Sequence, residues 1–93
     1  MNVIEACNKA FANEHVSLDL LYYIFSNFDE DLYSNLDIET FGIRIKCLNT
    51  HEEVCIPNIT CSFTKIKELA ETVTRNLVTP IAFRDVVQDW LLI

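Results

Sequence analysis

The C-terminal third of the chain carries two apolar stripes, each repeating at the period of an α-helix. The first stripe consists of Ile66, Leu69, Ala70, Val73 and Leu77. The second stripe consists of Phe83, Val86, Val87, Trp90 and Leu91. This spacing predicts amphipathic helices over residues 63–76 and 80–91. Because a helix with one apolar face is not stable alone, the rest of the chain must supply a layer that covers both stripes.

Capping residues mark where each helix begins. Ser62 or Thr64 can cap the first helix, because a side-chain oxygen accepts a hydrogen bond from a free N–H of the first turn. Thr79 and Pro80 mark the second helix, since proline is favoured at the first helical position. The two helices are therefore joined by a very tight corner.

The middle of the chain has the two-residue alternation of half-buried strands. Residues 41–48 alternate apolar residues with polar or small ones, and residues 54–61 resume a β-type composition after a polar turn. We expect these two segments to pair antiparallel. Pro57 cannot donate to a strand ladder, so it indicates an edge, a bulge or the end of the strand.

The N-terminal part is predicted to add further strands. Residues 15–25 fit either a helix or a strand, and their content of Val, Ile, Tyr and Phe favours the strand. Residues 2–11 form a weaker candidate strand, with a hairpin turn at 12–14. In a strand over 15–25, the side chains of Leu21, Tyr23 and Phe25 would need a cover of their own, either a dimer partner or the loop that follows.

The predicted architecture is α+β: a three- to four-stranded antiparallel meander with two C-terminal helices packed on one face. Residues 1–93 are expected to form a single domain. The sheet would lie within 1–61 and the helical pair within 62–93. Residues 26–40 would be the longest connection and form an acidic loop.

Charge is distributed unevenly along the chain. The formal net charge is −7, and residues 1–61 carry the whole acidic excess. Such a surface repels phosphate groups, so we expect neither nucleic acid nor an anionic membrane as a partner. The sequence shows no signal peptide and no apolar run of about 18 residues, which predicts a cytoplasmic protein without a membrane span.

The residues that carry chemistry are few and scattered. Without a signal peptide, Cys7, Cys47, Cys55 and Cys61 are expected to be reduced thiols in the core. Their spacing lacks the close pairs of a structural zinc site. Cys47 and His51 could pair only across a turn, with no third group to orient the imidazole. We therefore predict no catalytic residue, no cofactor-binding residue and no metal ligand.

The presence of a single glycine argues against a phosphate-binding function. A loop that cradles phosphate needs several glycines, and Gly42 is the only one in the chain. Its place inside a predicted strand indicates a bulge or close packing against Trp90 or another aromatic ring. The acidic segment beginning at Asp29 also lacks the ligand pattern of an EF-hand, although weak binding of a divalent cation stays open.

Three motifs together resemble a family of small uncharacterised proteins from clostridial and related Gram-positive bacteria. These are Phe41-Gly42-Ile43, Asn76-x-Val78-x-Pro80 and Asp85-Val86-Val87-x-Asp89-Trp90-Leu91. The resemblance covers residues 16–93. It implies a small bacterial domain of unknown function and brings no mechanism with it.

The leading hypothesis is a non-enzymatic protein–protein interaction or regulatory module that acts as a homodimer. The alternative is an acidic inhibitor or nucleic-acid mimic that occupies a basic site on another protein. The predicted interaction surface consists of Asp29, Glu30, Asp31, Asp37, Leu21, Tyr23 and Phe25.

Overall fold

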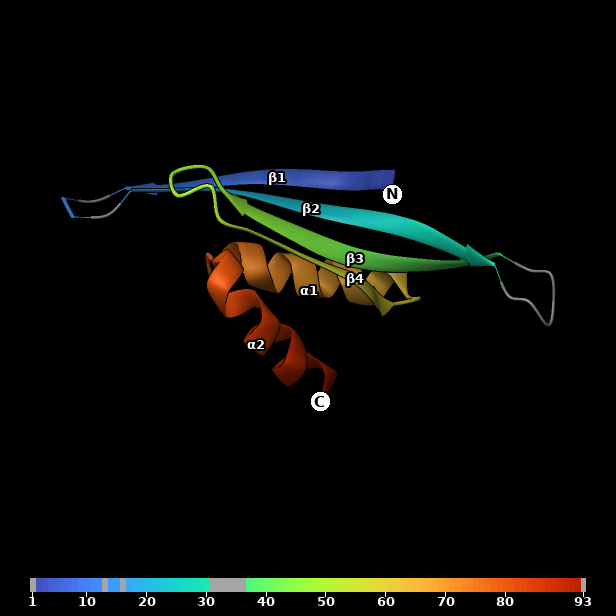
Figure 1. Ribbon diagram of the computed structural model, residues 1–93. Coiled ribbons are helices and arrows are strands. Elements are labelled where there is room, and N and C mark those ends of the chain that lie inside the picture. The colour runs from blue at the N-terminus through green and yellow to red at the C-terminus, as the bar shows by residue number, and fades with distance from the viewer. Residues whose placement is uncertain (1, 13, 16, 31–36, 93) are drawn as a thin grey trace.

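Four strands and then two helices make up the fold (Figure 1). The computed structural model describes residues 2–12, 14–15, 17–30 and 37–92. The elements are β1 (Asn2–Ala12), β2 (Ser17–Glu30), β3 (Asp37–Cys47), β4 (Glu53–Thr60), α1 (Phe63–Arg75) and α2 (Pro80–Leu91). The strands pair antiparallel in the order β1-β2-β3-β4, and both helices lie on the same side of the sheet. The predicted α+β meander with two C-terminal helices is confirmed.

The helices begin where the capping residues predict. The Ser62 hydroxyl accepts a hydrogen bond from the Lys65 backbone N–H at 3.3 Å. Thr79 occupies the N-cap position of α2 without a side-chain bond of that kind, and Pro80 is the first helical residue. The corner between the helices is made by Leu77, which adopts φ 51°. Neither α1, with 13 residues, nor α2, with 12, is long and apolar enough to cross a bilayer.

The prediction of a strand within residues 15–25 is confirmed from Ser17 onward, but the prediction of a loop over 26–40 is wrong for residues 26–30 and 37–40, which belong to β2 and β3. β2 continues to Glu30, β3 begins at Asp37, and these two residues face each other in the pairing. The β2–β3 hairpin extends beyond the helices (Figure 1). A strand that has water on both faces can carry polar side chains on both faces. Its sequence then lacks the apolar alternation of a half-buried strand, so the sequence pattern predicts a loop. Residues 31–36 of the predicted loop lie outside the described residues.

The core lies between the sheet and the helices. Its sheet members are Leu20, Tyr22, Ile24, Phe41, Ile43, Ile45, Cys47 and Val54. Its helix members are Ile66, Leu69, Val73, Phe83 and Val87. The rings of Phe41 and Phe63 pack edge to face, with 5.7 Å between the ring centroids. The Tyr22 hydroxyl donates a hydrogen bond to the Val78 carbonyl at 3.0 Å. This hydrogen bond fastens the corner between the two helices to the centre of the sheet.

We expect the fold to lose stability between about pH 10 and 12 through Tyr22. Burial, the largest cause, raises the pKa of the Tyr22 phenol from 10.0 to about 12. The neutral phenol is therefore favoured in the folded state. The contribution of the Tyr22 phenol to the free energy of unfolding is complete below pH 10 and is lost as the pH rises through the pKa of the folded state. The loss should reach about 2–3 kcal/mol. Urea unfolding at a series of pH values gives the free energy of unfolding of wild type and of Tyr22→Phe. Between pH 10 and 12 this free energy should fall more steeply with pH in wild type than in the variant. An equal dependence on pH in the two proteins would contradict the prediction.

Candidate functional site

The side of the sheet away from the helices carries the apolar half of the predicted interaction surface. Leu21 and Tyr23 lie there and are half-buried. Phe25 was predicted to share their exposure, and this is wrong because it is only 1% exposed. The reason is Gly42, which faces Phe25 in the pairing and leaves room for the ring against β4. The predicted close packing of Gly42 on an aromatic ring is thus confirmed, but the ring is Phe25 and not Trp90.

Paired charges lie on the same face, beside Tyr23. The Arg44 guanidinium contacts the Glu53 carboxylate at 2.7 Å, and it lies 5.8 Å from the centre of the Tyr23 ring. The hydrogen bond from Arg44 holds the pKa of Glu53 below its usual value. Because these charges are already matched within the chain, they contribute little to attracting a charged partner.

The acidic half of the predicted surface is separate from the apolar half. Asp29, Glu30 and Asp37 lie at the ends of β2 and β3, and Asp31 lies outside the described residues. Asp29 follows Leu21 by eight positions on one strand, or about 27 Å. The fold therefore does not gather the predicted residues into a single patch.

Among the described acidic residues, the distribution covers both layers of the fold. Glu5 belongs to β1, Glu53 to β4, Glu68 to α1 and Asp89 to α2. Two of them are paired within the chain, Glu5 with Lys67 and Glu53 with Arg44. An acidic mimic would need its carboxylates on one face, and the described residues do not concentrate them in that way.

The cysteines differ from the prediction of four core thiols. Cys47 is buried as expected, but Cys7, Cys55 and Cys61 are exposed. Cys7 lies on a strand that no helix covers, Cys55 faces away from the helices, and Cys61 follows the end of β4. The two-residue alternation places a residue on one face or the other, but it does not reveal which face will be covered. Within the described residues, no three His, Cys, Asp or Glu side chains are grouped to hold a metal ion.

Cys47 and His51 lie at the two ends of the β3–β4 turn. The backbone N–H of His51 donates to the Cys47 carbonyl at 2.9 Å, and His51 has φ 63°. Hydrogen bonding from the Thr50 side chain, the largest cause, lowers the pKa of the Cys47 thiol. The thiol is buried whereas His51 is exposed, so the turn orients backbone groups and does not form an open nucleophile–base pair.

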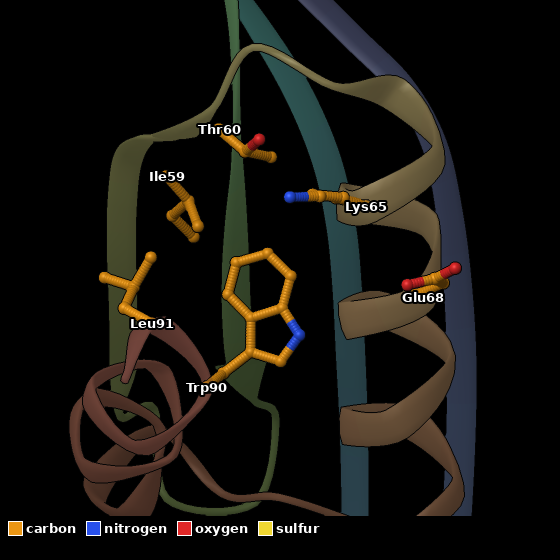
Figure 2. Close-up of a pocket in the computed structure, with 6 residues that line it drawn as sticks. All are labelled: Ile59, Thr60, Lys65, Glu68, Trp90 and Leu91. Carbon is orange, nitrogen blue, oxygen red and sulfur yellow. The ribbon is translucent and has the colours of Figure 1, made fainter. Parts of the chain in front are cut away.

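A pocket of about 270 Å³ opens between β4, α1 and α2 (Figure 2). Its lining consists of Ile59, Thr60, Lys65, Glu68, Trp90 and Leu91. Trp90 belongs to the second predicted apolar stripe, and it packs against the core but is only half-buried, because α2 diverges from the sheet towards its C-terminal end (Figure 1). The indole stands in the opening between β4 and α1 (Figure 2). The volume is just below the roughly 300–1,000 Å³ of small-molecule sites, and the lining mixes apolar side chains with Thr60, Lys65 and Glu68, so the pocket is small for a cofactor.

β1 is exposed along its whole length and forms a second candidate binding surface, apart from this pocket. All eleven residues of β1 are exposed, including Val3, Ile4 and Phe11. β1 ends the sheet on one side, and an ion pair of 2.7 Å between Lys67 of α1 and Glu5 connects it to the helical layer. The backbone N–H and C=O groups on the outer edge of β1 are consequently open to a further strand.

The opposite edge of the sheet is protected against such pairing. β4 contains Pro57, which has no N–H to donate, and Asn58 beside it adopts φ 57°. The pairing of β4 with β3 also shifts register between Phe41 and Ile43. A proline and a bulge are devices that prevent a strand from adding at an edge. The pairing of β1 with β2 has its one irregularity between Val3 and Glu5 and is regular from Glu5 to Ala12.

Comparison with known proteins places the chain without adding a mechanism. A model of a family of unknown function, DUF6514, matches residues 1–92. The chain has no significant match among curated proteins or among solved structures. The match bears out the resemblance to an uncharacterised domain family, and it spans the sheet, both helices and the open edge of β1. The chain therefore belongs to the family of unknown function DUF6514.

Proposed function

We propose that the chain is a non-enzymatic protein-interaction module that binds a partner by adding a strand to the outer edge of β1. The observation that carries the proposal is the contrast between the two edges of the sheet. β4 is blocked by Pro57 and a bulge, whereas β1 is exposed over its whole length. An open edge of this length is a template for a partner strand, with affinity supplied by main-chain hydrogen bonds.

The face of the sheet away from the helices supports the same proposal. Leu21 and Tyr23 are half-buried there, next to the exposed strand. A strand added to β1 would extend this face and cover more of its apolar surface. Specificity would come from side chains that alternate between the two faces of the added strand.

A proline variant of β1 tests the proposal. Successive backbone N–H groups of a strand point to opposite edges, so either Cys7→Pro or Asn8→Pro removes an outward N–H and leaves the pairing with β2 intact. Thermal melting identifies that variant as the more stable of the two. Cys7→Ala or Asn8→Ala at the same position is the matched control.

The readout is affinity capture from the native cell with wild type, the stable proline variant and its alanine control. We expect wild type and the alanine control to retain the same partner, either another protein or a further copy of the chain, and the proline variant to lose it. Equal capture by all three would place the binding surface elsewhere. If wild type retains nothing and does not self-associate, the proposed function is wrong.

A further inference from the structure

We infer that β1 pairs antiparallel with β1 of a second copy of the chain, about a two-fold axis that passes beside Cys7. The inference rests on the proposed function and names its partner. Two copies present identical open edges, and a symmetric dimer needs a surface that is complementary to itself. The residues of β1 meet this requirement in one register.

Side-chain direction restricts the registers that are available. Glu5, Cys7 and Lys9 face Ile24, Tyr22 and Leu20 of β2. These three β2 residues belong to the core, so the side of β1 that carries Glu5, Cys7 and Lys9 is the side of the helices. Directly opposed residues in an antiparallel pair share one face. In a symmetric β1 pair, a helix-side residue must therefore oppose another helix-side residue.

Charge selects one register from those that remain. With the axis at Cys7, Glu5 of each copy lies opposite Lys9 of the other. With the axis at Glu5 or at Lys9, like charges would oppose each other, which is destabilising. Any other axis on this face leaves both charges without a charged residue opposite. Only the axis at Cys7 pairs the acidic and the basic residue of β1, and it does so twice.

Both charged side chains are available for this contact. Glu5 and Lys9 are exposed. Glu5 is already held by Lys67 at 2.7 Å, which fixes its carboxylate on the helix side of the sheet. A carboxylate can accept hydrogen bonds from two ammonium groups. Lys9 of the second copy would then complete a group of three charges with Lys67 and Glu5.

Charge reversal tests the dimer. We expect wild type to approach twice the 10.8 kDa of one chain in light scattering as concentration rises. Lys9→Glu and Glu5→Lys should each weaken association by about tenfold, because each places like charges opposite each other twice. An equimolar mixture of the two variants should recover it, since every opposed pair is then of opposite sign. Lys65→Glu, the same change on α1 away from β1, is the control.

Chemical cross-linking tests the register. In a Cys55→Ser, Cys61→Ser background, Cys7 is the exposed thiol of the described residues. A short bismaleimide adds one thiol across each of its double bonds and should join Cys7 of one copy to Cys7 of the other. In the same background, Cys7→Ser with Lys9→Cys should give no covalent dimer. At the inferred register, two residues at position 9 lie about 13 Å apart, so the reagent chosen must be shorter than this.

The outcomes separate this inference from the proposed function. A monomer at every concentration would overturn the self-pairing, and so would a dimer unaffected by Lys9→Glu or without a Cys7 cross-link. In that case, capture of a different protein by wild type, lost in the proline variant, would leave the proposed function standing. A monomer with no such capture would end both.

Discussion

Gly42→Ala is expected to destabilise the fold by about 3 kcal/mol, because β4 leaves no room for a side chain at this position. A methyl group there would overlap the Ile56 carbonyl oxygen and lie 2.8 Å from the Pro57 Cα and 2.7 Å from the Phe25 Cζ. Two of these atoms belong to the backbone and cannot move without disturbing the pairing of β3 and β4. Urea unfolding followed by circular dichroism measures the loss.

Two further variants make this result specific. Lys46→Ala, on the same strand and face, should change the free energy of unfolding by less than about 0.5 kcal/mol. Phe25→Leu in the Gly42→Ala background should recover only part of the loss, since it relieves the clash with the ring but not those with the backbone. A Gly42→Ala protein as stable as wild type would show that β4 does not pass so close to β3.

Phe83→Ala is expected to cost about 3–5 kcal/mol, because it opens a cavity in the middle of the core. Phe83 is 0% exposed and lies in the core cluster between α2 and the sheet. Trp90→Ala on the same helix is the comparison and should cost less, although the side chain is larger. Trp90 is half-buried and its ring lines the pocket, so its removal loses fewer contacts.

Thermal and urea unfolding of both variants measure this difference. A loss for Trp90→Ala equal to or greater than that for Phe83→Ala would show that α2 packs against the sheet along its full length. Ile81→Ala, at a residue 77% exposed on the outer side of α2, should be close to neutral and serves as the control.

The candidate site could be predicted only in part, and β2 shows why. Its alternation places Leu21 and Tyr23 correctly on the face away from the helices. The same alternation places Phe25 with them, although Phe25 is buried, because a strand pattern does not report the glycine that faces it on the next strand. The charge pair of Glu5 and Lys9 around Cys7 is visible in the sequence. It becomes informative only once β1 is known to lie at the edge of the sheet.

The sequence by itself determined both helices, the antiparallel meander and the strand that begins at Ser17, because helix and strand periodicity and helix capping depend on neighbouring residues along the chain. It did not determine how far β2 and β3 extend, because their polar ends lack that periodicity. Only the tertiary structure decided which surfaces remain open. The positions of the helices on the sheet and the order of its strands decide that β1, Cys7 and Cys55 are exposed and that Phe25 is buried. These positions are set by contacts between residues that lie far apart in the chain.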